Sequence, residues 1–173
     1  MKNLSILLFA ILLVFASCSS DDDNSNDQID LTVDITGSWE LTSLEYEGES
    51  TIEVENQTLT ISFDGFGKDF DAQVNFTEDP NEVTSTGSYT LVLTTNFMGE
   101  SITQEQFVDF SDDSITGEWS IENGNQLVVV SNGETQTAEI ISLNESKMVL
   151  LTNESTTIDG VNVIISSEMT LER

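Results

Sequence analysis

The stretch DFDAQVNF, at residues 69–76, has the alternation that decides the fold. Its apolar residues Phe70, Ala72, Val74 and Phe76 stand at every second position, with polar residues between them. Because successive side chains of a strand point to opposite faces, the pattern predicts a strand with one buried and one solvated face. After residue 17, no window of about a dozen residues carries a helical stripe. Similar strands are expected in TLTISF (58–63), SYTLVLTTNF (88–97), ITQEQFVDF (102–110) and VNVIISSEMTL (161–171).

Turn-forming residues separate these runs at intervals of roughly eight to twelve residues, as in sandwiches and barrels. The predicted turns are Glu47-Gly48, Asp64-Gly65, Asp79-Pro80-Asn81, Met98-Gly99, Asn123-Gly124-Asn125, Asn132-Gly133 and Asp159-Gly160. The residues from Leu31 onward suffice for one domain. We therefore expect an all-β domain, an antiparallel meander of about 8–10 strands. Such a sheet, with one apolar face, either closes on itself or packs on a second sheet.

The first residues are typical of a targeting signal rather than of part of the domain. A lysine precedes an apolar run, Ile6–Phe15, that is too short to span a bilayer and fits a signal peptide over residues 1–17. The following Phe15-Ala16-Ser17-Cys18 resembles a bacterial lipobox, which implies that Cys18 is lipidated, with palmitate among its acyl chains, and anchors the mature chain to a membrane. The alternative is a cysteine that follows an ordinary secretory signal.

Residues 18–31 join this anchor to the predicted domain at 32–173. The segment SSDDDNSNDQID is acidic and has no aromatic residue, so it predicts a flexible tether. Its first residues resemble the acidic export signals of some Gram-negative lipoproteins. That resemblance implies the outer face of the outer membrane, and the alternative is an acidic spacer facing the periplasm.

The charge balance excludes several classes of function. The chain has 4 basic and 32 acidic residues and a formal net charge of −28. Nucleic acid is excluded as a partner because its binding needs a basic surface. An anionic lipid surface would repel the body of the protein, which leaves the N-terminal lipid as the contact with the membrane.

Catalytic chemistry has few candidates in this sequence. There is no histidine, which excludes Ser-His-Asp triads and histidine metal sites, and a lipidated Cys18 leaves no thiol for nucleophilic attack or zinc. Only carboxylates remain, and among 32 acids some pair is always close, so proximity carries no information. We expect a protein that is not an enzyme and has no cofactor.

Two acidic clusters are weak calcium candidates, and neither matches the spacing of an EF-hand loop. In the first cluster, the alternative is that Asp64-Gly65 and Gly67 form a hairpin turn with solvated acids, and no metal site is expected. The clusters are Asp64, Asp69 and Asp71, and Asp109, Asp112 and Asp113.

Two tryptophans share one frame, ITGSWEL at 35–41 and ITGEWSI at 115–121. Gly37 and Trp39 stand where Gly-x-Trp begins the first strand of lipocalins and fatty-acid-binding proteins, a family that this sequence resembles. The resemblance implies an up-and-down β-barrel whose closed end is plugged by Trp39, with Arg173 stacked on it; the alternative is that Arg173 is a charged C-terminus. We expect the frame to recur, with Gly117 and Trp119, because the same turn is used twice. A phase slip after Leu41 predicts a bulge near Thr42-Ser43.

The later segments GEWSI, NGN and AEIISLNESKMVLL resemble the lipocalin-like domains of bacterial lipoproteins. This resemblance implies a module that binds a small apolar or amphipathic molecule. The expected cavity is lined by Phe63, Phe76, Tyr89, Leu91 and Phe97. The alternative is a barrel filled by its own side chains, acting as a structural or interaction subunit of a cell-envelope assembly.

Overall fold

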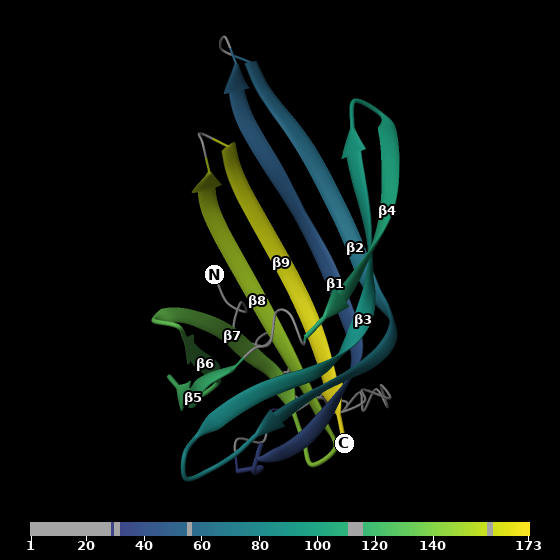
Figure 1. Ribbon diagram of the computed structural model, residues 1–173. Helices are drawn as coiled ribbons and strands as arrows, with labels where there is room; N and C mark the ends of the chain where they lie inside the picture. The colour runs from purple at the N-terminus through teal and green to yellow at the C-terminus, as the bar shows by residue number, and fades with distance from the viewer. Residues whose placement is uncertain (1–28, 30–31, 55–56, 111–115, 159–160) are drawn as a thin grey trace, which may run out of the picture.

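The computed structural model describes residues 29, 32–54, 57–110, 116–158 and 161–173, which form an all-β domain (Figure 1). The predicted signal peptide, Cys18 and most of the tether lie outside these residues, as do Asp112, Asp113 and Asp159-Gly160. The strands are β1 (Gly37–Val54), β2 (Gln57–Phe76), β3 (Glu82–Phe97), β4 (Glu100–Asp109), β5 (Thr116–Glu122), β6 (Gln126–Ser131), β7 (Glu134–Leu143), β8 (Lys147–Ile158) and β9 (Val161–Glu172).

The nine strands form a ring-like antiparallel meander, which confirms the predicted fold class. The last strand, β9, pairs with the first, β1, and β1 pairs in turn with β2. β3 lies beside β2, pairs with β5 through Glu82–Thr84 and pairs with β4 through Ser88–Phe97. Each strand from β5 to β9 then pairs with the next, so the circuit of pairings returns to its start.

The two ends of this ring differ (Figure 1). At one end, where the chain turns between β2 and β3 and between β7 and β8, the strands converge on a buried core. At the other end the hairpins β1–β2, β3–β4 and β8–β9 extend well beyond the short strands β5 and β6. We call the first the closed end. Its fully buried side chains are Trp39, Leu44, Val83, Ile140, Leu143, Met148 and Leu171.

The predicted alternation holds along β2 and β9. Phe70, Ala72, Val74 and Phe76 face the interior, while the acids and amides between them face outward. In β9 the register places Met169 and Leu171 opposite the buried Leu44 and Leu41. The bulge predicted near Thr42-Ser43 is also confirmed, because β1 changes register against β9 between Leu41 and Ser43.

Two predicted turns are wrong. Glu47-Gly48 and Asp64-Gly65 lie inside the long strands β1 and β2, which run past them without interruption. Gly48 faces inward where the Phe63 ring and the Ile164 carbonyl leave no room for a Cβ atom, so this glycine serves close packing rather than a turn. The turns at Asp79-Pro80-Asn81, Met98-Gly99, Asn123-Gly124-Asn125 and Asn132-Gly133 are confirmed.

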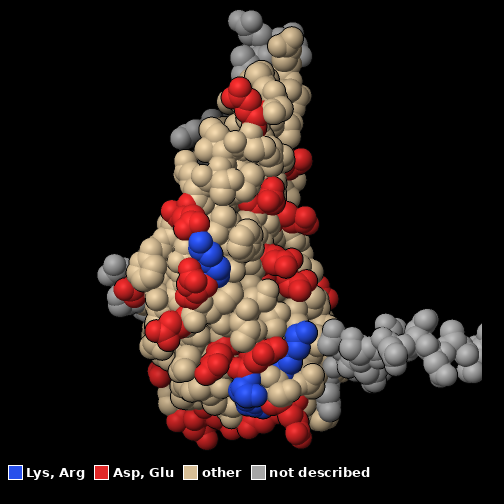
Figure 2. All heavy atoms as spheres, turned by 90° about the vertical axis from the view of Figure 1, so that its right-hand side faces the viewer, with Lys and Arg blue, Asp and Glu red and all other residues tan. Residues whose placement is uncertain are grey.

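Acidic side chains far outnumber basic ones in this protein. Figure 2 shows them scattered over the visible face with few basic side chains among them. The Lys68 ammonium forms an ion pair of 2.7 Å with Glu105 across β3. Within the described part of the chain, no helix has the length and apolarity needed to cross a bilayer.

Candidate ligand-binding cavity

Arg173 covers Trp39 at the closed end. Its guanidinium carbon lies 4.2 Å from the centroid of the Trp39 ring, the stacking that the family resemblance implied. The same guanidinium donates hydrogen bonds to the carbonyl oxygens of Glu145 (2.7 Å), Thr36 (2.8 Å) and Asp34 (2.9 Å). Since these carbonyls belong to the segment before β1 and to the β7–β8 turn, this side chain joins both of them to the end of β9.

The segment before β1 is fixed by short-range hydrogen bonds. The Trp39 indole N–H donates to the Ile35 carbonyl at 2.8 Å, and the Asp34 carboxylate accepts bonds from the Thr36 backbone N–H and hydroxyl, at 2.8 and 2.9 Å. The bond from the Thr36 backbone lowers the pKa of Asp34, with the Thr36 hydroxyl and the nearby Arg173 acting in the same direction.

The second tryptophan occupies a different corner. The Trp119 indole N–H donates to the Thr77 carbonyl at 2.9 Å, and its ring meets Phe76 edge-on at a centroid distance of 5.8 Å. The expectation of one turn used twice is wrong. Gly37 has a positive φ of 106°, whereas Gly117 stands inside β5, where a Cβ atom would lie 2.5 Å from the Val130 carbonyl oxygen of β6.

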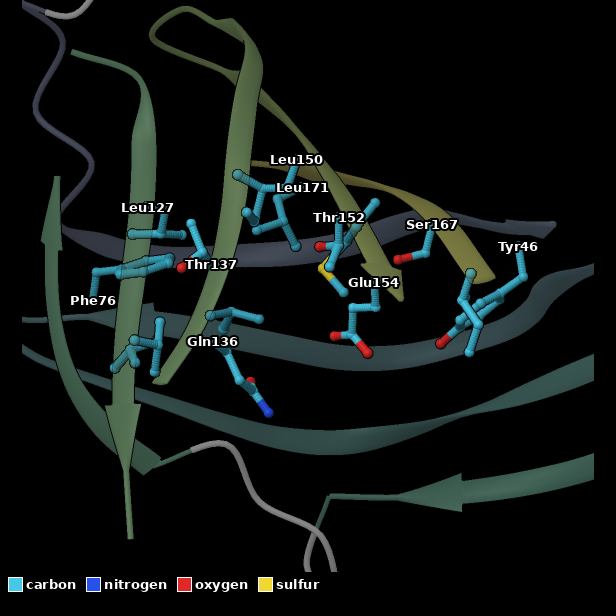
Figure 3. Close-up of a pocket in the computed structure, with 16 residues that line it drawn as sticks. Tyr46, Phe76, Leu127, Gln136, Thr137, Leu150, Thr152, Glu154, Ser167 and Leu171 are labelled. Carbon is cyan, nitrogen blue, oxygen red and sulfur yellow. The ribbon is translucent and has the colours of Figure 1, made fainter. Parts of the chain in front are cut away.

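A cavity of about 370 Å³ lies inside the ring (Figure 3). Its deep wall is apolar and comes from strands on both sides of the ring. That wall consists of Val74, Phe76, Val83, Leu127, Val129, Ala138, Leu150, Met169 and Leu171. The volume lies within the range of about 300–1,000 Å³ that is typical of small-molecule pockets.

Polar side chains line the cavity farther from the closed end. The register of β8, β9 and β1 places Thr152, Ser167 and Tyr46 side by side in one row across the inner face. In the next row Glu154 stands opposite Ile165, and Gln136 faces them from β7 (Figure 3). The cavity therefore has an apolar floor and a polar level above it, which suits an amphipathic molecule.

An aromatic cluster fills the interior beside the cavity. Tyr89 of β3 is buried between Phe70 and Phe110, at centroid distances of 6.1 and 5.8 Å. Burial raises the pKa of Tyr89 well above its usual value, and the charge and hydrogen bond of Tyr46 raise it further. Tyr46 thus joins this cluster to the polar level of the cavity.

Only one of the five residues expected to contact a ligand lines this cavity, namely Phe76. Tyr89 belongs to the aromatic cluster, and Leu91 packs against the core. Phe63 lies over Gly48 in the long part of β2, and Phe97 is half exposed near the β3–β4 tip. The structure does not bring these five side chains together.

Most of the lining residues missed by sequence reasoning lie on β6 to β9. A signal for them exists in MVLLTNE, where the inward positions Met148, Leu150, Thr152 and Glu154 change from apolar to polar along the strand. Ile165, Met169 and Leu171, which also line the cavity, share one face of β9 by the same alternation.

The first calcium candidate, made of Asp64, Asp69 and Asp71, does not form a metal site, and the second includes Asp112 and Asp113, which lie outside the described residues. Within the described part of the chain, no three Asp, Glu, His or Cys residues are grouped so that they could hold a metal ion. Asp64 accepts a hydrogen bond of 3.3 Å from the Asn96 amide on the outer face, and Asp69 stands at a register shift of β2 with a positive φ of 53°. The alternative of a hairpin turn at Asp64-Gly65 is wrong, since β2 continues through it.

Comparison with known proteins gives one informative match. No curated protein sequence matches the chain. Among solved structures, Ail, the attachment invasion locus protein of Yersinia pestis, is 10% identical and covers 80% of this chain and 99% of its own. Its TM-score of 0.27 is too low to support an argument. The family model described as "Lipocalin-like domain" matches residues 35–150, and the chain therefore belongs to the lipocalin-like domain family.

Proposed function

We propose that this protein is a lipid-anchored lipoprotein of the bacterial outer membrane whose lipocalin-like domain binds a small apolar or amphipathic molecule without transforming it. The observation that carries the binding proposal is the cavity of about 370 Å³, with its apolar floor and polar upper level. A core filled by its own side chains would leave no such space.

The anchoring proposal rests on the signal peptide, the lipobox and the place where the chain enters the domain. Ile29 forms a bridge with Leu143, which ends β7 at the closed end. Ile29 is 11 residues beyond Cys18, so a lipid at that cysteine would hold the closed end within roughly 40 Å of the membrane. The long hairpins would then point away from the bilayer, toward the cell exterior or, as the alternative, into the periplasm.

A pair of neighbouring serines tests the binding proposal. Ser167 lines the cavity, and Ser166 faces outward on the same strand, where it pairs with Glu47 and Asn153. The uncharged fluorescent probe N-phenyl-1-naphthylamine should bind the purified protein and lose at least about tenfold in affinity when Ser167→Phe fills the cavity. Ser166→Phe should leave the affinity unchanged. Absence of probe binding, with no small molecule retained in native mass spectrometry, would refute the proposal.

Lipidation at Cys18 and the location of the domain can be tested separately. Cells supplied with labelled palmitate should yield labelled protein, and Cys18→Ala should abolish the label. Externally added protease on intact cells should digest a surface-exposed domain, whereas digestion only after the outer membrane is opened would place it in the periplasm.

A second candidate function is that of an interaction subunit in an envelope assembly. The β3–β4 hairpin favours it, since this hairpin carries Met98, Phe107 and Ile102 at 78%, 67% and 61% exposure. No other described strand pairs with the outer edge of β4. Crosslinking from Ile102 in cells should then trap one envelope protein, and Phe107→Ser should reduce the yield of that crosslink.

A further inference from the structure

The structure assigns the cavity to amphiphiles with a cationic head group, held by the carboxylate of Glu154; this inference rests on the ligand-binding function proposed above. Among the described residues that line the cavity, Glu154 alone carries a charge. Figure 3 shows its carboxylate pointing into the space that Gln136 also faces.

The position of Glu154 follows from the register of β8. Glu154 stands opposite Ile165, one inward position beyond the Thr152–Ser167 pair. Three oxygen-bearing side chains, those of Tyr46, Thr152 and Ser167, therefore lie between this carboxylate and the apolar floor. An ammonium group at this level would meet a carboxylate and hydroxyl acceptors while its chain occupied the floor.

An anionic head group would find no counter-charge in the cavity. Each basic side chain that the structure describes lies elsewhere. Lys68 is paired with Glu105 on the outer face, and Arg173 is held by three carbonyls at the closed end. Lys147 pairs in register with Glu172, which faces outward. A carboxylate or phosphate in the cavity would thus lose hydration without an ion pair and would lie beside Glu154, both of which disfavour binding.

The net charge of the protein, −28, also attracts cations, and the test must separate this general field from Glu154. Glu168 provides the control. It is an exposed carboxylate on the outer face of β9, opposite Glu45 and Leu151. Glu154→Gln and Glu168→Gln remove the same charge, one inside the ring and one outside it.

The experiment measures displacement of N-phenyl-1-naphthylamine from the purified protein by dodecylammonium, dodecanol and dodecanoate in 150 mM salt, which screens charges beyond about 8 Å. The wild type should bind dodecylammonium most tightly and dodecanoate least. Because Glu154 is exposed to solvent, which weakens an ion pair, Glu154→Gln should weaken dodecylammonium binding only about two- to fivefold. It should leave dodecanol binding unchanged, and Glu168→Gln should change neither.

Three results would overturn the inference. Dodecanoate that binds as tightly as dodecylammonium would show that the cavity does not select cations. An equal loss in both glutamine variants would assign the preference to the general field. A probe that binds but is displaced by none of the three amphiphiles would refute the head-group assignment and leave the cavity function intact, whereas a probe that does not bind at all would refute both.

Discussion

The two Ile-Thr-Gly-x-Trp corners share a sequence frame but differ in structure. Trp39 is fully buried beneath Arg173, and its indole bonds to Ile35, only four residues before it. Trp119 is half-buried, and its indole bonds to Thr77, 42 residues before it. The first corner is therefore built from its own segment and sealed by the last residue, while the second depends on the loop between β2 and β3. A short motif predicts an inward tryptophan, and the surroundings determine its contribution.

The largest expected effect is that of removing each indole. Trp39→Ala should lower the free energy of unfolding by about 3–5 kcal/mol, since it empties a fully buried site. Trp119→Ala should cost about 1–3 kcal/mol, since less of its surface is buried. Urea denaturation monitored by circular dichroism measures both. Equal losses would contradict the proposed difference between the two corners.

Arg173 is the next largest contributor. Arg173→Ala should lower the free energy of unfolding by about 2–3 kcal/mol, because it removes the contact with Trp39 and the bonds to three carbonyls. Arg173→Lys should recover less than half of this loss, since an ammonium cannot reach three carbonyls in a fixed fork. Lys147→Ala removes one positive charge nearby and should change stability by less than about 0.5 kcal/mol. A lysine variant as stable as the wild type would show that charge alone matters at this corner.

Substitution of the glycine in each of the two frames should destabilise the protein for a different physical reason. Gly37→Ala should cost about 1–2 kcal/mol through backbone strain at its positive φ. Gly117→Ala should instead push β5 away from the Val130 carbonyl of β6. Since Val129 pairs with Trp119 and lines the cavity, only Gly117→Ala should weaken probe binding. Equal probe affinities in the two variants would contradict this distinction.

The fold was predictable from sequence to a greater extent than the cavity. Period-two alternation places Val74 and Phe76 on one face without knowledge of any neighbour, and the phase slip after Leu41 locates the bulge. Which residues line the cavity depends on the register between strands, which sets the side chains that lie side by side around the ring. Tyr46 pairs with Ser167, 121 residues away, and no local sequence pattern predicts that pairing. Gly48 and Gly65 resemble turn residues in the sequence for the same reason. Each is a glycine because an atom of a neighbouring strand leaves no room for a Cβ atom, and the sequence around it carries no sign of that strand.

The smallest expected effect is a pH dependence of stability that Asp34 gives to the first corner and that the second corner lacks. Asp34 precedes the first frame, and Ser114 stands at the matching position before the second. The hydrogen bonds from Thr36 lower the pKa of Asp34 in the folded protein below its usual value. A carboxyl whose pKa is lowered by folding stabilises the folded protein at pH values above its usual pKa. This stabilisation is lost as the pH falls through the lowered pKa of the folded state. Asp34→Asn should therefore be less stable than the wild type at neutral pH.

The stability difference between the wild type and Asp34→Asn should stay constant from about pH 8 to pH 5 and shrink as the pH falls through the lowered pKa of Asp34. Urea denaturation at a series of pH values measures it. Asp71→Asn removes the same charge from the outer face of β2, away from this corner, and controls for net charge. Since the net charge of −28 favours removal of any carboxylate at neutral pH, the Asp34 variant should be less stable than the Asp71 variant there. Identical pH profiles for the two variants would show that the Asp34–Thr36 bonds add nothing to the first corner.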